Sequence, residues 1–468
     1  MKILAILAIL TAIYVFSRLQ HMRLGHPIVI SSFLLFGTMQ IVFDLPAFGY
    51  AIVSGEIDDP YPGVVLMSGF LAFMGFYAIG GGLSRECRRI RRRFTEEGLR
   101  QPYPEKYYAI GIGLTGALLI LLGLYYYRGV PPIAEAANRL ISGESDSYGI
   151  AGYMREMRYD LTKGYYFGEE YRGQGLIRIM MWMGWPYLLA SCISNYAIAK
   201  RKLWVLLGAV TGILGLVFIS GDGTRAPVLL GLLNIIVLLS FLRKISLSKS
   251  VIYGLLSLFL VLGLTIISHK GILFFEHQEN PWAALLSRIA ERVFVSNGMN
   301  SIHIVELIRS GALPQGLGEL HVNKFSNALP GIHSNLPLAH ELSMLLMYKT
   351  STAYQTMTYS GFVYADFGIY GVLAIFSLLG VVLAKADKLI FDRPKVVTRL
   401  PVLAGTVFSL GTIPLYGPVG VISSLIVLVT IDYLFRMFAG GYHIFEQGTS
   451  KRFVGQGRER HFRVDSMG

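Results

Sequence analysis

Long apolar runs without charge are the feature that most restricts the fold of this chain. Such runs, each near twenty residues, recur along its 468 residues, of which 53% are hydrophobic and 15% charged. A run of this length crosses the hydrocarbon of a bilayer, where backbone groups find hydrogen-bond partners only inside a helix. The sequence therefore predicts an all-α, polytopic integral membrane protein with about eleven transmembrane helices.

Basic residues alternate between the loops that join these runs. The predicted helices lie at about residues 3–17, 28–43, 63–81, 107–127, 175–198, 203–219, 226–242, 250–267, 360–383, 400–414 and 418–435. The Lys and Arg clusters fill every second loop, at 18–27, 85–106, 200–202, 243–249, 385–399 and the C-terminal tail. The positive-inside rule places these loops in the cytoplasm and the remaining loops outside. It also accounts for the net charge of +13, so no nucleic-acid partner is expected.

The predicted topology divides the chain into six parts. They are transmembrane helices 1 to 4 (1–127), a first large external loop (128–172), helices 5 to 8 (173–267), a second large external loop (268–358), helices 9 to 11 (359–436) and a basic cytoplasmic tail (437–468). The second loop is polar, and its apolar positions between about 281 and 296 recur with helical spacing. We therefore expect amphipathic helices that lie over a cavity at the external face.

Two arginines lie at external ends of predicted helices. Arg225 is in residues 221–227 (Gly-Asp-Gly-Thr-Arg-Ala-Pro), where small residues allow a ligand close to the backbone. Its planar guanidinium suits a phosphate, and the alternative is an arginine that snorkels to lipid headgroups or pairs with Asp222. Arg178, a few residues into the fifth predicted helix, either points into the bundle or a cavity as a substrate-binding residue, or snorkels to the headgroups.

The second loop supplies further candidates. Arg288 and Arg292 are four residues apart and share one helix face, either to hold an anion or as a solvated face beside Glu291. His333, His340 and Glu341 lie in a loop broken by Pro and Gly, and such groups can remove a proton from an attacking hydroxyl near neutral pH. Zinc is the rival interpretation, but the histidine spacing and a cysteine partner are missing, so no metal is predicted.

Two motifs resemble those of a known family. Residues 218–231 (Phe-Ile-Ser-Gly-Asp-Gly-Thr-Arg-Ala-Pro-Val-Leu-Leu-Gly) resemble the Gly-x-Arg helix boundary of bacterial O-antigen and oligosaccharide repeat-unit polymerases of the Wzy type. Residues 358–371 resemble their second signature, Tyr-x-Asp-Phe-Gly-x-x-Gly after a Thr/Ser-rich end of the large loop. The family's motif arginine falls on Arg225, and the second motif supplies Tyr359, Tyr364 and Asp366 as candidate substrate-binding residues.

The resemblance implies a GT-C-like fold and a metal-independent glycosyltransferase without a cofactor. A growing glycan on undecaprenyl pyrophosphate would pass to a hydroxyl of a new lipid-linked unit, at the periplasmic face of the bacterial inner membrane. Donor and acceptor are both lipid-linked oligosaccharides, and a chain-length regulator is an expected partner. The related ligases place a histidine late in the large loop, where His333 and His340 are the nearest matches.

Three alternatives stay open from the sequence. An O-antigen ligase would share the architecture but pass the glycan to lipid A core, and its usual His-Asn setting is missing here. A glycosyltransferase that uses a polyprenyl monophosphate sugar would take Asp58 or Asp59 as its acid, although both also suit a turn before Pro60. A polysaccharide or lipid transporter would place polar residues near the middle of its helices.

Overall fold

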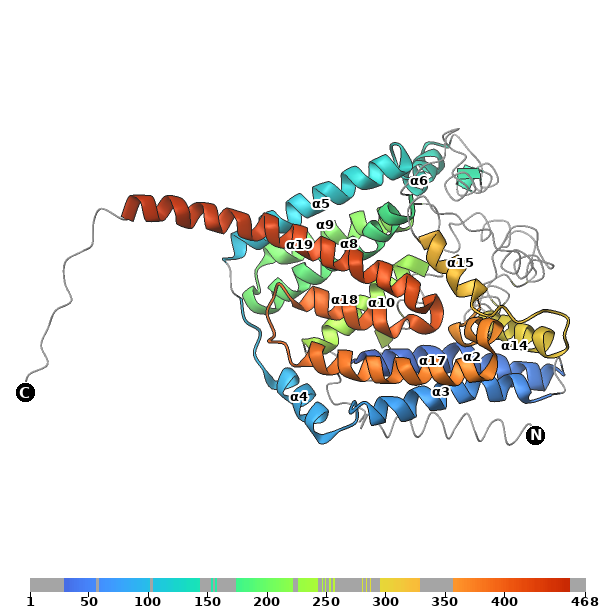
Figure 1. Cartoon of the computed structure of the whole chain (residues 1–468). Coiled ribbons are helices and arrows are strands. Elements are labelled where there is room, and N and C mark those ends of the chain that lie inside the picture. The colour runs from blue at the N-terminus through green and yellow to red at the C-terminus, as the bar shows by residue number, and fades with distance from the viewer. Residues whose placement is uncertain are drawn as a thin grey trace, which may run out of the picture.

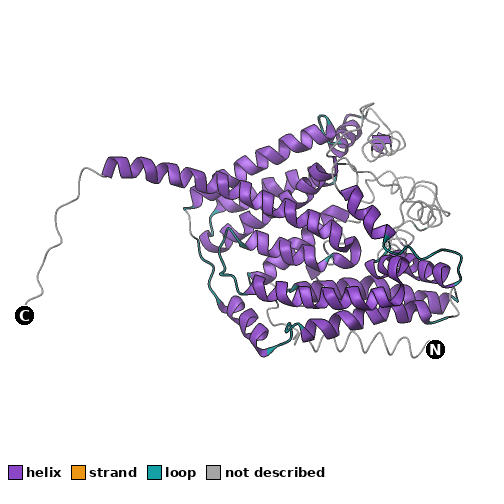
Figure 2. Cartoon of the chain, in the orientation of Figure 1, coloured by secondary structure: helices purple, strands orange, loops and turns teal. Residues whose placement is uncertain are grey.

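The computed structural model shows a bundle of helices. It describes residues 29–55, 59–101, 104–143, 174–221, 226–242, 295–328 and 357–454, with a few isolated positions between them. Within these residues every regular element is a helix, and Figure 2 shows no strand among them. The predicted all-α fold is confirmed for this part of the chain.

Seven helices are long and apolar enough to span a membrane. They are α2 (Ser32–Ser54), α3 (Tyr61–Ile79), α5 (Glu105–Tyr127), α8 (Gln174–Ala199), α9 (Lys202–Ile219), α17 (Tyr359–Phe391) and α19 (Ile413–Val454). Two predicted spans correspond to the shorter apolar helices α10 (Ala226–Phe241) and α18 (Leu400–Gly411). The predicted span 3–17 lies outside the described residues, and so does the span 250–267 apart from a few isolated positions. The count of about eleven transmembrane helices therefore stays a prediction.

The bundle has two apolar cores. In Figure 1, α2, α3 and α17 lie together on one side, and α5, α8, α9 and α19 on the other, with α10 and α18 between them. Aromatic rings fill the first core, for example Phe33, Phe36 and Phe73, and Tyr187 and Trp204 are buried in the second. Helix α2 is longer than predicted, since the sequence suggests an end before Asp44. Gln40 and Ser360 hydrogen-bond that carboxyl group inside the bundle, so the helix continues to Ser54.

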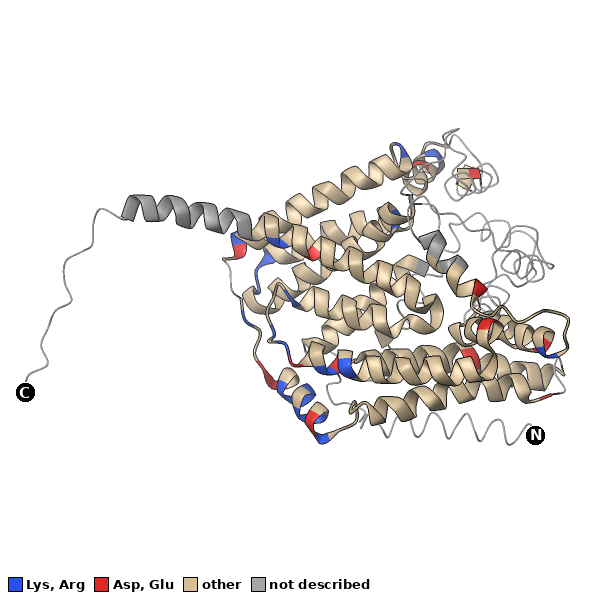
Figure 3. Cartoon of the chain, viewed as in Figure 1, with Lys and Arg blue, Asp and Glu red and all other residues tan. Residues whose placement is uncertain are grey.

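The predicted cytoplasmic loops meet at one end of the bundle. Arg201 pairs with Glu105 at 3.3 Å, Lys388 pairs with Glu86 at 2.8 Å, and the Arg100 amide donates to the Lys395 carbonyl. These contacts join three basic segments that are far apart in the sequence. In Figure 3 most of the positions coloured as Lys or Arg lie at this end, where helix α4 (Arg85–Glu96) also lies. We call it the basic end.

The opposite end, which we call the loop end, carries the segments that the charge pattern places outside. Helix α6 (Pro132–Ser142) meets the end of α9, where the Ile133 amide donates to the Gly221 carbonyl. Helices α14 (Ser296–Arg309) and α15 (Glu319–Ala328) come from the second large loop and pack on α17. The expected amphipathic helix near 281–296 lies almost wholly outside the described residues.

Helix α14 is buried rather than laid over the surface. Ser301 and Ile302 are fully buried, and the chain of α14 approaches α2 and α17 closely at two glycines. A Cβ on Gly298 would lie 2.3 Å from the Phe43 carbonyl oxygen, and one on Gly361 would lie 2.6 Å from Ser301. The second large loop therefore contributes a helix to the bundle itself.

Candidate functional site at the loop end

The second motif of the sequence forms a break in α17. Within this helix Gly368 has φ 64° and ψ −165°, a backbone conformation that is essentially restricted to glycine. A Cβ at this position would also lie 2.8 Å from the side-chain nitrogen of Gln315. The break separates the first segment, residues 359–367, from the long apolar remainder of α17. The motif glycine is therefore a structural requirement.

Asp366 lies just before this break and holds the start of α15. Its side chain is fully buried and accepts the backbone N–H groups of Leu320 at 3.0 Å and His321 at 2.9 Å. These amides belong to the first turn of α15, where a helix leaves its N–H groups without intrahelical partners. The Gly316 amide donates to the Ala365 carbonyl beside them. The motif aspartate thus ties the second large loop to the transmembrane bundle.

The same carboxylate orients a histidine. Nδ1 of His321 lies 2.5 Å from Oδ2 of Asp366, and Nε2 lies 3.2 Å from the Tyr359 hydroxyl. The imidazole packs against the rings of Tyr359, Phe362 and Phe367, and its side chain keeps 22% exposure. A carboxylate on Nδ1 fixes the ring so that Nε2 can accept a proton. We call His321, Asp366 and Tyr359 the loop-end triad.

A second hydrogen-bond network begins on the other side of the same segment. The Ser360 hydroxyl donates to the buried carboxyl group of Asp44 at 3.1 Å and lies 2.8 Å from the Thr358 hydroxyl. The Thr358 hydroxyl in turn lies 2.8 Å from the Ser301 hydroxyl of α14. Thr358 and Ser360 therefore contact α14 and α2, whereas Tyr359, which lies between them in sequence, contacts α15. This alternation fixes the position of Tyr359 beside His321.

Tyr364 belongs to a third group, on the rim of the loop end. Its hydroxyl lies 3.5 Å from that of Tyr61, and the Arg309 guanidinium lies over the Tyr61 ring at 4.5 Å. Arg309 also forms an ion pair with Asp59, which accepts the Tyr61 amide at 2.9 Å. The Tyr61 amide and then Arg309 lower the pKa of Asp59. Because an acid that acts near neutral pH needs a raised pKa, this environment disfavours Asp59 as a catalytic acid.

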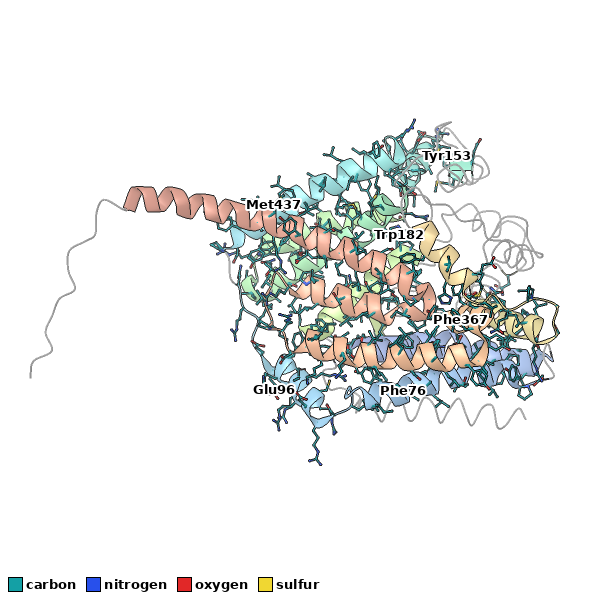
Figure 4. All side chains as sticks on the ribbon, viewed as in Figure 1. Phe76, Glu96, Tyr153, Trp182, Phe367 and Met437 are labelled. Carbon is teal, nitrogen blue, oxygen red and sulfur yellow. The ribbon has the colours of Figure 1, made fainter. Side chains whose placement is uncertain are left out.

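Arg178 is at another part of the loop end. Its guanidinium lies 4.6 Å from the ring of Trp182, one turn further along α8. Figure 4 shows Trp182 well separated from Phe367, which marks the triad. The structure thus brings Tyr359 and Asp366 together, places Tyr364 on the adjoining rim, and does not join Arg178 to them.

Six predicted site residues lie outside the described residues: Arg225, Arg288, Arg292, His333, His340 and Glu341. Asp58 lies outside them as well. Within the described part of the chain, no three His, Cys, Asp or Glu side chains come together as a metal site would require.

His321 is the functional candidate that the sequence did not single out. It is one of six histidines in the second large loop and precedes Asp366 by 45 residues. Its local signal is modest, a Gly-x-Gly turn at 316–318 directly before α15, where Gly318 has φ 99°. Only the contact of α15 with the break in α17 distinguishes it from the other histidines.

A comparison with known protein families gives a match. Residues 176–401 match the model of a family described as "Putative O-antigen polymerase". The matched span includes Arg225 and the whole loop-end triad, and it leaves out α2 and α3. No curated protein and no solved structure matches the chain. The family supports a polymerase role in O-antigen synthesis, a glycosyltransferase-like activity. Residues 176–401 are therefore similar to the O-antigen polymerase family, as the two motifs predict.

Proposed function

We propose that the protein polymerises oligosaccharide repeat units linked to undecaprenyl pyrophosphate. The growing glycan leaves its lipid pyrophosphate and joins a hydroxyl of a new lipid-linked unit. The loop-end triad is the observation that carries this proposal beyond the family match. It combines an oriented imidazole, a partly exposed position and an apolar bundle beside it.

The triad supplies a base for the attacking hydroxyl. Asp366 accepts Nδ1–H of His321, so Nε2 is free to take the proton of the acceptor hydroxyl when that hydroxyl replaces the Tyr359 hydroxyl. The acceptor oxygen then bonds to the anomeric carbon of the donor glycan. The bond from that carbon to the pyrophosphate oxygen breaks, and undecaprenyl pyrophosphate leaves with the electron pair. His333, His340 and Glu341 stay candidates for the same role.

Arg225 is our candidate for stabilising the leaving group. It directly precedes α10, which starts at Ala226. A guanidinium holds two phosphate oxygens in a fixed fork, whereas an ammonium acts as a point charge. Arg225→Lys should therefore lose about a hundredfold in rate, as expected for a lost contact to transition-state charge. Near-normal polymer from Arg225→Lys would remove this role and favour Arg288 and Arg292.

The charge pattern supports a periplasmic site. The basic end carries the Lys and Arg clusters, and the triad lies at the opposite end (Figure 3). Under the positive-inside rule the basic end is cytoplasmic and the triad faces the exterior of the inner membrane. A chain-length regulator would then reach the protein from the same face as the growing glycan.

Reconstitution tests the proposed reaction. The full chain is placed in vesicles with purified lipid-linked repeat units and no other enzyme. We expect a ladder of products spaced by one repeat unit, with one undecaprenyl pyrophosphate released for each bond formed. Transfer to lipid A core alone would instead show a ligase. Movement of lipid-linked units across the vesicle membrane without bond formation would show a transporter.

A further inference from the structure

Helix α4 at the basic end is an amphipathic helix with an arginine-rich outer face. Its inward positions Cys87, Ile90 and Phe94 are buried, and the Phe94 ring lies 5.3 Å from those of Phe241 and Phe391. Six arginines occupy most of the remaining positions of the helix. The apolar stripe therefore fixes which way the arginines face.

One of these arginines anchors the helix. Arg91 donates to the Gly82 carbonyl at 3.2 Å and to the Tyr77 hydroxyl, and it lies 3.7 Å from the Asp387 carboxylate. Beyond α4, Arg100 and Val397 are joined by a backbone hydrogen bond of 3.0 Å. Helix α4 and the segment after it are thus both fastened to the bundle, so the backbone that carries the outer side chains is held in place.

The outer side chains line a groove of about 660 Å³. Its walls are Arg89, Arg92, Arg93, Glu96, Glu97 and Arg100. Arg92 pairs with Glu96 at 2.8 Å and Arg100 pairs with Glu97 at 3.0 Å, which leaves two positive charges. Those charges belong to Arg89 and Arg93, one turn apart and both exposed. Within the described residues neither lies within ion-pair distance of a carboxylate, although the charge of Arg89 acts on Glu86, which is itself paired with Lys388.

We infer that this groove binds the phosphate of an anionic phospholipid headgroup. Two guanidinium groups one turn apart offer paired N–H donors that match phosphate oxygens. Helix α4, which supplies most of the groove lining, lies at the basic end of the bundle beside the ends of α3 and α17 (Figure 1). Polybasic amphipathic helices in this position attract anionic lipids. The bound headgroup would hold α4, and through Arg91 the α3–α17 pair, at the membrane surface.

Two double variants, each of which removes two positive charges from α4, test this inference. Arg89→Gln with Arg93→Gln removes the two unpaired groove cations, whereas Arg85→Gln with Arg88→Gln removes two exposed cations of α4 outside the groove lining. Neither pair includes Arg91 or the buried stripe. Binding of phosphatidylglycerol and of phosphatidylcholine to the detergent-solubilised full chain is measured by native mass spectrometry, and thermal midpoints confirm that both variants are folded.

We expect the wild type to retain phosphatidylglycerol in preference to phosphatidylcholine. The Arg89/Arg93 variant should bind it about tenfold more weakly, and the Arg85/Arg88 variant nearly as well as the wild type. Equal losses of phosphatidylglycerol binding in the two variants would show that the lipid is attracted by the charge of the whole helix. That result would overturn the groove as a binding site. Displacement of the lipid by millimolar inorganic phosphate would overturn a lipid as its ligand.

Discussion

Two buried aspartates on α17 each accept backbone amides at the start of another helix, at opposite ends of the molecule, but only Asp366 also contacts a histidine. Asp366 at the loop end and Asp387 at the basic end are both fully buried. Asp366 accepts two amides from the first turn of α15, and Asp387 accepts the Ser32 and Phe33 amides at the start of α2. A buried carboxylate on a helix start is therefore no signal of catalysis by itself.

The other partners separate the two sites. Asp387 also accepts the hydroxyls of Ser32 at 2.6 Å and Tyr77 at 2.7 Å, and its cationic neighbour is Arg91, which stays charged at any working pH. Asp366 instead holds His321, whose second nitrogen reaches Tyr359 and whose side chain is 22% exposed. Asp387 thus holds a group of fixed charge, whereas Asp366 orients an imidazole, the side chain that most often acts as a general base.

The largest expected effect is on the histidine. His321→Gln keeps a hydrogen-bonding side chain of similar reach but removes the group that accepts the proton. Polymer formation from purified lipid-linked units should fall about 10²- to 10⁴-fold, the usual contribution of a general base. The thermal midpoint should stay close to that of the wild type. An active His321→Gln enzyme would move the role of base to another histidine of the same loop, His333 or His340.

Asp387→Ala should act on stability instead. It leaves the Arg91 guanidinium, 16% exposed, without its carboxylate and removes the partner of the Ser32 amide. Breaking a buried ion pair in this way costs about 3–5 kcal/mol. Thermal unfolding in detergent measures the loss. Glu86→Ala is the matched control, because its pair with Lys388 faces solvent and should contribute little. Similar midpoints for the two variants would contradict the comparison.

Gly368→Ala tests the break that brings Asp366 to α15. An L-residue at φ 64° and ψ −165° costs about 1–3 kcal/mol, and the new methyl group meets Gln315. Gly113→Ala, in the open interior of α5, is the control and should be nearly neutral. We also expect Gly368→Ala to lower the rate of polymer formation per folded molecule, because α15 carries His321. A stable, fully active Gly368→Ala protein would show that the break is dispensable.

The smallest expected effect is on the thermal midpoint of a variant at Asp59, on the rim of the loop end. The Tyr61 amide and then Arg309 lower the pKa of Asp59, so this contact stabilises the folded state above the unfolded pKa. The contribution is lost as the pH falls through the lowered folded pKa. Wild type and Asp59→Asn should therefore differ in thermal midpoint at about pH 7 and converge as the pH falls through the lowered pKa of Asp59. A difference that does not change with pH would indicate that the charge of Asp59 plays no part.

The apolar helices could be predicted from the sequence with good boundaries. Residues 203–219 and 107–127 correspond to α9 (Lys202–Ile219) and α5 (Glu105–Tyr127), because a bilayer allows only helices and charged residues mark their ends. Three helices extend further than predicted. Helices α17 and α19 continue to Phe391 and Val454, and in α2 the buried carboxyl group of Asp44 interrupts the apolar run but not the helix. Its partner Ser360 is more than 300 residues away, so no local pattern could indicate it.

Only the part of the candidate site that lies on α17 could be predicted from the sequence. The motif identified Tyr359 and Asp366, since it lies within a single stretch of chain. Their partner His321 comes from α15, and the two parts meet only because α17 breaks at Gly368. The polar sequence of α14 likewise favours a surface helix, yet Ser301 is fully buried because Thr358 hydrogen-bonds its hydroxyl. Contacts of this kind depend on tertiary packing rather than on periodicity.

The same substitution at the two ends of α17 tests the account most directly. Asp366→Asn and Asp387→Asn are compared in vesicles with purified lipid-linked repeat units, at equal amounts of folded protein. An asparagine beside Nδ1 no longer fixes the histidine tautomer, so Asp366→Asn should lose at least about a hundredfold in polymer formation per molecule. Asp387→Asn should keep the wild-type rate per folded molecule despite a lower thermal midpoint. Equal activity of the two variants would contradict the assignment of the chemistry to the loop-end triad.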